Sequence, residues 1–328
     1  MINIVPADTS GCGYYRLMQQ ATLLHQLKKP VVLSTPSTFI GFKSDVTYTQ
    51  RILSDNLFEK LIDFKKQTGT KFIIDYDDLI WEYKGESLPE YNLCRQKIDC
   101  KATTKALEKH LDKLADKITV TTETLKDSLS QFTDKPIYVM PNMLSYKEWY
   151  MAQSPAPKRE SFMFAGSYTH FDNVNKQYGD FSKNMVQFLS NKEVQVKSLS
   201  PYFLKPKVTY PGSLLTTYAN DFWKQTRDVR FIIAPLAQNV FNTCKSDLKY
   251  LECCALGRVC LASDFPGCPY SAVAHPYQLI PVGSTSKAIQ YIVDRASEHY
   301  DEILQHQYQF LSTRWLDNHI NEYLDILQ

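Results

Sequence analysis

Short apolar runs alternate with amphipathic segments along the chain, and this alternation restricts the folds that it can adopt. The runs that predict buried strands in the first half cover residues 2–6, 31–34, 71–76, 117–121 and 137–140. Between them, residues 14–29, 56–66 and 95–116 carry apolar side chains at helical spacing. Strands that alternate with helices form a parallel sheet covered by helices, with functional loops at the carboxyl ends of the strands. The sequence therefore predicts an α/β fold.

The alternation begins again after a break in the middle of the chain. Residues 153–160 are rich in proline and polar residues, which is typical of a domain boundary. The second half repeats the pattern, with strand-like runs at residues 161–165, 194–199, 231–234 and 259–262 and a helix at residues 246–256 that Gly257 ends. We predict a first domain over residues 1–153, a second over residues 160–300, and terminal helices over residues 301–328 that pack across both.

The overall charge points to no particular class of partner. The 328 residues include 37 Lys plus Arg and 35 Asp plus Glu, a net charge of +2, so a polyanion would have to bind to a local patch. The sequence has no run of about 18 apolar residues and no basic segment followed by an apolar run. Its 8 cysteines lack the paired spacing of a metal site. We expect a cytoplasmic protein with reduced thiols.

The segment with the most specific pattern for a ligand covers residues 241–252. Lys245, Lys249 and Glu252 recur at positions i, i+4 and i+7, so they project from one face near the start of a helix. Ser246 lies beside them. A helix N-terminus attracts phosphate, lysines add cationic donors, and a carboxylate one turn further can accept both ribose hydroxyls. The pattern predicts a nucleoside diphosphate site; the alternative is a solvated Lys/Glu face of an amphipathic helix.

A second candidate segment follows the first strand of the second domain. Gly166 lets the backbone approach a ligand closely, and the hydroxyls of Ser167 and Thr169 can bond to a phosphate or a sugar. The alternative is an ordinary turn between a strand and a helix.

Three carboxylates, Asp75, Asp77 and Asp78, end the apolar strand at residues 71–76. Carboxylates in such a cluster raise one another's proton affinity, and one that faces a cleft can act as a general base. Asp77 and Asp78 are equal candidates for this role, while Asp75 is a candidate acceptor-side residue. The alternatives are helix capping, a divalent-metal site or surface charge.

The loop at residues 9–16 resembles a phosphate loop but lacks the spacing of both the dinucleotide-binding motif and the ATP-binding P-loop. Gly13 remains a candidate donor-binding residue in it. Arg16, in the helix that follows, can point into an interdomain cleft and contact an anionic ligand.

In this order, these segments resemble those of GT-B glycosyltransferases, and more narrowly the bacteriophage enzymes that glycosylate hydroxymethylcytosine in DNA. The residues that carry the resemblance are the turn Gly166-Ser167, the helix-like residues 184–189, and Lys249 three positions before Glu252. The resemblance implies two Rossmann-like domains whose parallel sheets face an interdomain cleft. It also implies a UDP-sugar donor, with Glu252 on the ribose, Lys249 on the diphosphate and Lys245 as an additional basic group beside it.

The same resemblance implies that a strand of the first domain ends at the catalytic base, where Asp77 or Asp78 stands. Two departures matter. The phage enzymes carry arginines after the Gly-Ser turn, whereas this chain has Tyr168, Thr169 and His170, so other groups must help to bind the diphosphate. Retaining GT-B enzymes commonly carry an earlier glutamate where this chain has Cys244, which favours inversion through an aspartate base without a metal.

We therefore expect a monomeric enzyme that moves glucose or arabinose from a UDP-sugar to 5-hydroxymethylcytosine in double-stranded phage DNA, in the host cytoplasm. DNA would cross the interdomain cleft with the target base flipped toward the donor. Candidate phosphate contacts, which can equally be solvated surface, are Lys60, Lys65, Lys66, Lys97 and Lys101. The alternatives are a glycosyltransferase for a polysaccharide or a lipid-linked sugar, and a non-catalytic module that binds nucleotide-sugar or DNA.

Overall fold

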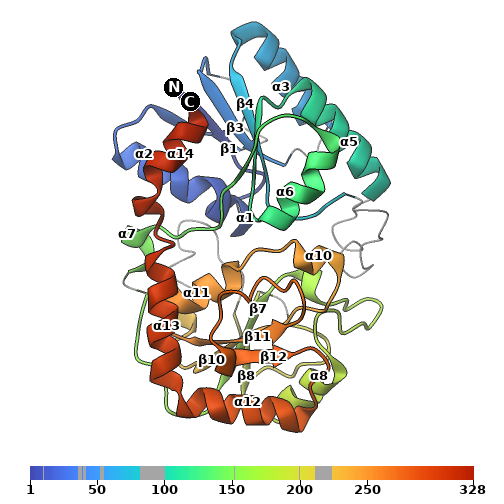
Figure 1. The fold of residues 1–328 in the computed structure, drawn as a ribbon, viewed down its shortest axis with the longest axis vertical. Helices are drawn as coiled ribbons and strands as arrows, with labels where there is room; N and C mark the ends of the chain where they lie inside the picture. The colour runs from blue at the N-terminus through green and yellow to red at the C-terminus, as the bar shows by residue number, and fades with distance from the viewer. Residues whose placement is uncertain are drawn as a thin grey trace.

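The fold consists of two lobes, each built on a six-stranded parallel sheet (Figure 1). It is taken from a computed structural model that describes residues 1–9, 11–35, 39, 42–51, 55–81, 100–150, 152–198, 200–210 and 224–328. All strand pairs within the two sheets are parallel, as the alternation of strands and helices predicts.

The first lobe contains the sheet formed by the first half of the chain. Its strands lie in the order β2 (Val31–Leu33), β1 (Ile2–Val5), β3 (Val46–Gln50), β4 (Lys71–Tyr76), β5 (Lys117–Val120) and β6 (Ile137–Val139). Its helical segments are α1 (Gly11–Gly13), η1 (Tyr14–Met18), α2 (Gln19–Gln26), α3 (Asp55–Thr68), α5 (Cys100–Lys113), α6 (Glu123–Leu129), η2 (Ser130–Phe132) and α7 (Tyr146–Trp149).

The second lobe contains the sheet formed by the second half. Its strands lie in the order β12 (Leu279–Pro281), β11 (Val259–Asp264), β10 (Phe231–Ala234), β7 (Phe162–Gly166), β8 (Val194–Ser198) and β9 (Val208–Tyr210). Its helical segments are η3 (Tyr168–His170), α8 (Lys183–Leu189), α10 (Val240–Thr243), α11 (Leu248–Leu256), η5 (Pro276–Gln278), α12 (Ser286–Glu298) and α13 (Tyr300–Ser312).

The C-terminal segment returns from the second lobe to the first along one side of the molecule (Figure 1). Helix α13 packs against α11 and β11 of the second lobe. After η6 (Leu316–Asn318), helix α14 (Ile320–Leu327) packs Tyr323 into the core of the first lobe, where its ring lies 5.8 Å from that of Tyr48. The two chain termini therefore lie close together in the first lobe.

The observed elements confirm most of the predicted strands and helices. Strands β4 and β10 have the predicted bounds, and α11 ends at Gly257, whose φ of 64° is the left-handed conformation that glycine adopts readily. Strands β3, β9 and β12 do not appear among the predicted ones. The predicted single helix at residues 14–29 is wrong in detail, because its first part, η1, is a π-helix.

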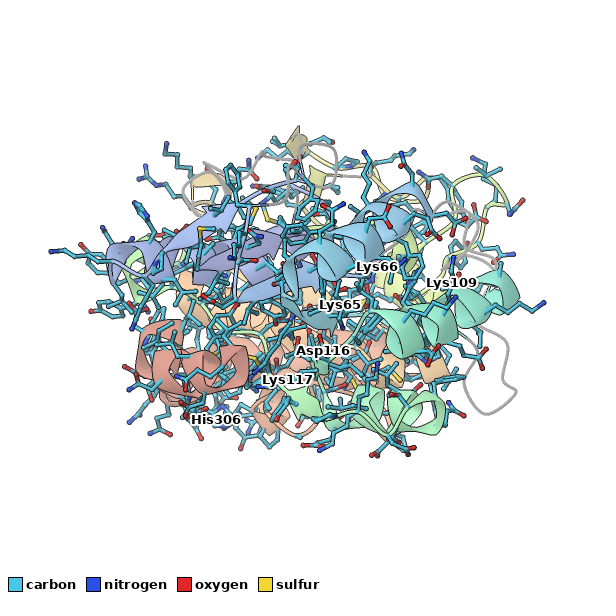
Figure 2. All side chains as sticks on the ribbon, turned by 90° about the horizontal axis from the view of Figure 1, so that it is seen from above. Lys65, Lys66, Lys109, Asp116, Lys117 and His306 are labelled. Carbon is cyan, nitrogen blue, oxygen red and sulfur yellow. The ribbon has the colours of Figure 1, made fainter. Side chains whose placement is uncertain are left out.

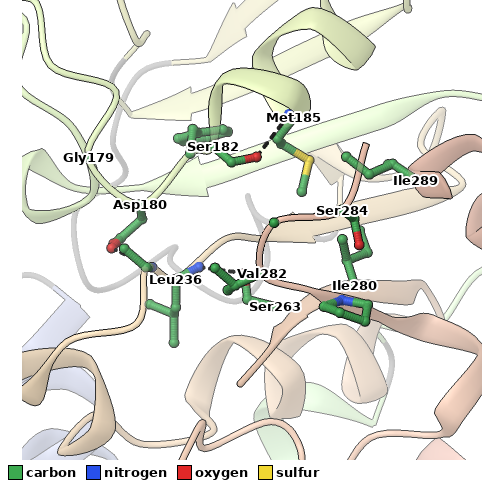
Figure 3. A pocket seen from close by; sticks show the side chains of 14 residues that line it. Gly179, Asp180, Ser182, Met185, Leu236, Ser263, Ile280, Val282, Ser284 and Ile289 are labelled. Carbon is green, nitrogen blue, oxygen red and sulfur yellow. Dashed lines mark hydrogen bonds between the residues drawn. The ribbon is translucent and has the colours of Figure 1, made fainter. Parts of the chain in front are cut away.

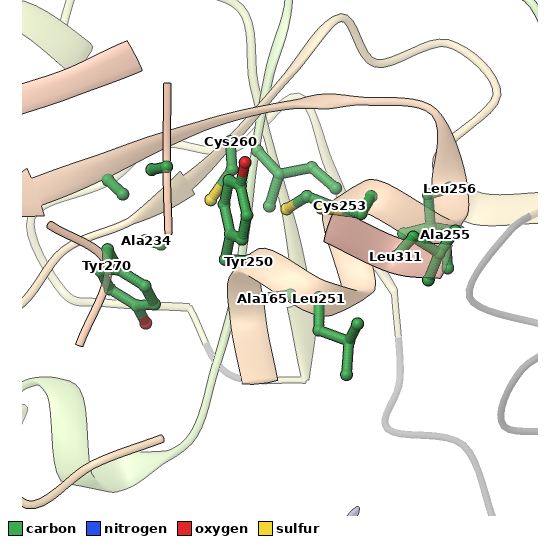
Figure 4. Packing of buried hydrophobic residues seen from close by; sticks show 14 of the residues in the cluster. Ala165, Ala234, Tyr250, Leu251, Cys253, Ala255, Leu256, Cys260, Tyr270 and Leu311 are labelled. Carbon is green, nitrogen blue, oxygen red and sulfur yellow. The ribbon is translucent and has the colours of Figure 1, made fainter. Parts of the chain in front are cut away.

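Helix α11 lies in the core of the second lobe. All of its residues from Tyr250 to Leu256 are buried, because the helix packs between the sheet and α13. Figure 4 shows Tyr250 and Cys253 packed near Cys260 of β11, with Leu311 of α13 close to the other end of the helix. Such all-round burial is typical of a core helix. It fixes the start of α11 relative to the strand ends of the second sheet.

The first lobe contains a buried ion pair between Arg16 of η1 and Asp75 of β4. The two side chains are 3% and 0% exposed, and the Arg16 guanidinium donates to both Asp75 oxygens, at 3.0 and 2.7 Å. It also donates to the carbonyl oxygen of Met140 and to the side chain of Asn142. A buried charge is stable only when it is paired in this way. The pair therefore fixes η1 over the carboxyl end of β4.

We predict that Arg16→Gln lowers the free energy of unfolding by about 3–5 kcal/mol, because the substitution leaves the Asp75 charge buried without its partner. Urea unfolding followed by circular dichroism measures the change. The control is Arg159→Gln, which removes an exposed pair with Glu193 and should cost less than about 1 kcal/mol. Equal losses for the two variants would contradict the structural role of the buried pair.

Candidate functional site

The start of α11 brings cationic groups to the carboxyl end of the second sheet. Lys245 lies in the short connection between α10 and α11, and Lys249 lies in the first turn of α11. Their side chains are 15% and 21% exposed. The residue that precedes the helix, Asp247, accepts a hydrogen bond from Arg314 at 2.6 Å. Both lysines are therefore partly withdrawn from solvent at a helix N-terminus, where an anion is favoured.

Glu252 is fully buried and is hydrogen-bonded on both carboxylate oxygens. Lys249 Nζ donates to Oε2 at 2.6 Å. The hydroxyl of Tyr15, which belongs to η1 of the first lobe, donates to Oε1. The carboxylate that the sequence predicts for a ribose thus points toward the first lobe and away from bulk solvent.

The two lobes meet directly at the predicted site. Lys245 Nζ lies 3.5 Å from Oδ1 of Asp78, at the end of β4. Ser246 Oγ accepts a hydrogen bond from Asn142 at 2.7 Å. The structure therefore places Asp78, a candidate base, directly opposite the lysine predicted to bind the donor.

Asp77 lies beside Asp78 but has a different environment. Arg51 lies 3.6 Å from Asp77 Oδ1. Burial raises the pKa of Asp77, but the charges of Arg51 and Arg16 and a hydrogen bond with Cys12 outweigh it, so the pKa lies below its ordinary value of 3.8. Burial and the neighbouring Asp77 raise the pKa of the Cys12 thiol well above its usual range. At neutral pH the Asp77 carboxyl is therefore ionised and the Cys12 thiol is neutral.

Three further predicted site residues make close contacts within the first lobe. Arg16 and Asp75 bind each other, and Arg16 uses Nε, Nη1 and Nη2 for partners within the first lobe. Gly13 packs so closely on the preceding loop that an added Cβ would lie 2.0 Å from the carbonyl oxygen of Asp8. The structure thus uses these residues to hold the first loop and η1 in place.

The Gly-Ser turn after β7 is equally tight. A Cβ at Gly166 would lie 2.3 Å from the ring of Phe164, so no side chain fits there. Ser167 Oγ lies 2.9 Å from Thr169 Oγ1, and Ser167 also accepts a hydrogen bond from the Thr169 amide. The Ser167 hydroxyl caps the short helix η3, and Ser167 is exposed while Thr169 is buried.

A pocket opens at the carboxyl end of the second sheet (Figure 3). It is lined by residues 179–182, 185, 236–237, 263, 280–284 and 289. Asp180 and Leu236 lie on one side, and Ile280 and Ser284 lie on the other (Figure 3). Ligands bind preferentially at this end of parallel sheets.

A histidine and an aspartate that sequence reasoning missed connect this pocket to η3 and α10. His170 Nδ1 lies 2.8 Å from Asp180 Oδ2, and Asp180 Oδ1 accepts from the amide of Ala237 and the side chain of Asn242. Burial lowers the pKa of His170, Asp180 opposes the shift, and the charges of Lys245 and Lys249 add to it. The spacing of ten residues between His170 and Asp180 gives no local signal of the pair. The same is true of Tyr15, whose partner Glu252 is 237 positions away.

Several of the candidate DNA contacts lie on α3 of the first lobe (Figure 2). Lys65 is bound to Asp116 and to the carbonyl oxygen of Leu114. Lys66 is 74% exposed and lies 3.9 Å from Asp63, and Lys60 is also exposed. Lys97 and the side chain of Lys101 lie outside the described residues.

Two features are absent from the described residues. They contain no group of three or more His, Cys, Asp or Glu side chains that could hold a metal ion. Within the same part of the chain, no helix has the length and apolar character needed to cross a membrane.

Comparison with known proteins identifies the fold. No protein-family model matches the sequence, and no curated protein sequence is significantly similar to it. Among solved structures, HepE of Anabaena in complex with UDP-glucose is similar with a TM-score of 0.62 at 10% identity, over 99% of both chains. The DNA-modifying enzyme β-glucosyltransferase is similar with a TM-score of 0.56 at 11% identity, over 99% of this chain and 97% of that one. The chain has the GT-B fold.

The GT-B fold also occurs in a larger neighbour. TarM of S. aureus matches with a TM-score of 0.55 at 12% identity, and the alignment covers 94% of this chain and 57% of TarM. The structure of a TarM mutant contains fondaparinux, α-GlcNAc-glycerol and UDP. Structural neighbours of this chain thus include a DNA-modifying enzyme and proteins solved with sugars.

We predict that Tyr15→Phe lowers the free energy of unfolding by about 1–3 kcal/mol, because it removes a hydrogen bond to a fully buried carboxylate. Thermal or urea unfolding measures the loss. Tyr202→Phe is the control: its hydroxyl bonds to the carbonyl oxygen of Lys176 at the surface, and its removal should change stability by no more than about 0.5 kcal/mol. An unchanged stability of Tyr15→Phe would contradict the contact between the lobes.

Proposed function

We propose that this chain is a glycosyltransferase that moves glucose or arabinose from a UDP-sugar to 5-hydroxymethylcytosine in phage DNA. The observation that carries the proposal is the arrangement around α11, within a GT-B fold. A buried carboxylate and two partly buried lysines lie at a helix start, across the junction of the lobes from an aspartate pair. This is the combination of charges that a nucleoside diphosphate and an acceptor hydroxyl require.

The donor would lie along the carboxyl end of the second sheet. In this proposal the base occupies the pocket between residues 236–237 and 280–284, and the diphosphate lies at Lys245 and Lys249. Glu252 receives the ribose hydroxyls, so its bond with the Tyr15 hydroxyl must be exchanged for bonds to the ribose. Ser167 supplies an exposed hydroxyl for the sugar or the phosphates, next to Gly166, where the missing side chain leaves room for the rings of Phe164 and His170.

The acceptor would enter from the first lobe. Asp77 or Asp78 takes the proton of the acceptor hydroxyl while its oxygen attacks the anomeric carbon of the sugar and UDP leaves, which inverts the configuration. Asp77 is ionised at neutral pH, because the charges of Arg51 and Arg16 hold its pKa below the ordinary value, which also makes it the weaker base. Asp78 has the advantage of its contact with Lys245. The rates of the Asp77→Asn and Asp78→Asn variants decide which of the two is the base.

A DNA acceptor is supported by the similarity to the DNA-modifying β-glucosyltransferase along nearly the whole of both chains. Lys60, in the middle of α3, is an exposed cation that can bind a phosphate, whereas Lys66 lies in the last turn of α3, beside the amino ends of β4 and β5 and away from the junction of the lobes. TarM, whose mutant structure contains fondaparinux and α-GlcNAc-glycerol, has a TM-score in the same range, so transfer to a glycan is the second candidate. The acceptor assay separates the two.

We predict that the protein, given a panel of UDP-sugars, adds one sugar mass to hydroxymethylcytosine in duplex DNA. Mass spectrometry of the digested nucleosides measures the product. Asp77→Asn or Asp78→Asn should lower the rate by at least about 100-fold for whichever residue is the base, because the acceptor then keeps its proton. The other variant should retain most of the activity.

The matched control is Asp63→Asn, which alters an exposed carboxylate on α3 and should leave the rate unchanged. If hydroxymethylcytosine never gains mass while UDP is released with a glycan acceptor, the DNA acceptor is wrong and the glycan candidate replaces it. If no acceptor gains mass and both aspartate variants bind UDP-sugar like the wild type, the chain is a binding module.

A further inference from the structure

Building on the donor site proposed above, we propose that His170, held by Asp180, is a ligand of the donor diphosphate that takes up a proton when the donor binds. His170 would then join Lys245 and Lys249 at the diphosphate. Its protonation also makes donor binding dependent on pH.

His170 lies next to the Gly-Ser turn. It is the last residue of η3, directly after the Gly-Ser turn that ends β7. Its ring packs over this turn, since a Cβ at Gly166 would lie 2.9 Å from His170 Cδ2. The ring also packs edge-on against Phe164, with centroids 5.9 Å apart. His170 therefore lies at the Gly-Ser turn of the proposed donor site, packed over the backbone of Gly166.

The orientation of the ring is fixed from the opposite side. Asp180 is 0% exposed in its side chain and binds His170 Nδ1 at 2.8 Å. Its other oxygen is held by the Ala237 amide at 3.0 Å and by Asn242 Nδ2 at 2.6 Å. Because the Asp180 carboxylate accepts, Nδ1 carries the hydrogen and the lone pair of the neutral ring lies on Nε2. Asp180 thereby leaves Nε2 to respond to a ligand.

His170 Nε2 is accessible to a ligand. Among the residues that the structure describes, none forms a hydrogen bond with Nε2, and this nitrogen is not among the buried unpaired atoms. The His170 side chain retains 15% exposure. Protonation would convert Nε2 from an acceptor into a cationic donor, which is what a phosphate oxygen binds.

The surrounding charges set the direction of the proton change. The charged groups that act on His170 are Asp180, from the loop before α8, and Lys245 and Lys249, from the start of α11. Tyr270, which lies near Asp180, is neutral because burial raises its pKa well above the ordinary value. In the free protein, burial and the two lysines hold the pKa of His170 below 6.5, against Asp180. The ring is therefore neutral at neutral pH.

A diphosphate bound at the lysines would reverse their effect. Its negative charge favours imidazolium, so the pKa of His170 rises on binding and the site takes up a proton. By linkage, affinity for the donor then increases as pH falls through the bound-state pKa, and it levels off below the free-state pKa. The cation on His170 would stand where the resembling phage enzymes carry arginine.

Calorimetric titration with UDP-glucose from about pH 5.5 to about pH 8 tests the proposal. This probe is suitable because its diphosphate is a diester that does not titrate near neutral pH, unlike that of UDP. For a bound-state pKa about one unit above the free-state value, affinity should rise toward the acid end by several-fold, with about tenfold as the limit. Titrations in buffers of different ionisation enthalpy should report uptake of a fraction of a proton near the middle of the range.

His170→Gln keeps a donor for Asp180 but cannot be protonated, so its affinity should be independent of pH and close to that of the wild type at the alkaline end. The matched control is His299→Gln, at the junction of α12 and α13, away from the first lobe (Figure 1). His299 Nδ1 also lies 2.8 Å from a carboxylate, that of Glu302. This variant should keep the pH dependence of the wild type.

Two results would overturn the role of His170: pH-independent binding without proton uptake by the wild type, or full pH dependence in His170→Gln. The wild-type measurement alone suffices if the variant does not fold. Failure of the wild type to bind UDP-glucose at any pH is a different result, because it overturns the proposed donor site itself.

Discussion

Glu252 is a carboxylate with no exposure to solvent, and the arrangement of the site depends on the groups that form hydrogen bonds with it. Moving a carboxylate into a protein interior costs several kcal/mol unless partners surround it. Here one partner, Lys249, comes from the same helix, and the other, Tyr15, comes from the other lobe. The same carboxylate therefore orients a lysine at the start of α11 and holds the first lobe against it. A ligand that takes the place of Tyr15 would exchange one set of hydrogen bonds for another, so the carboxylate would remain satisfied.

A chain of polar contacts connects this junction to the interior of the first lobe. Asp75 binds Arg16, Arg16 binds the side chain of Asn142, and Asn142 donates to Ser246 at 2.7 Å. Arg314, which follows α13, binds both the Asn142 carbonyl oxygen and Asp247 at the start of α11. The start of α11 is thus connected to the first lobe both through η1 and through the returning C-terminal segment. Movement of one lobe relative to the other would have to break these bonds, so they hold the two lobes in contact at the start of α11.

Sequence periodicity predicts the fold well where burial is continuous along the chain. Strands β4 and β10 are apolar runs covered on both faces, and their predicted bounds match. Strand β3 has the sequence VTYTQ, which is buried but largely polar, and β12 is three residues long and ends in proline. The π-helix at Tyr14–Met18 has no signal in the sequence, because it depends on partners of Arg16 and Tyr15 that are 59 and 237 positions away. For the site, the spacing of Lys249 and Glu252 predicts that they share one face of a helix. The contact between Tyr15 and Glu252 and the contact between His170 and Asp180 join residues without a recognisable spacing, so only the structure reveals them.

The most direct test of the donor site is the crystal structure of the protein with UDP-glucose. The charges at the start of α11 predict a diphosphate within hydrogen-bond distance of Lys245 or Lys249, and a ribose on Glu252 with the Tyr15 hydroxyl displaced. The uracil should lie in the pocket beside residues 280–284. A nucleotide bound elsewhere, with the bond between Tyr15 and Glu252 intact, would contradict the proposed site.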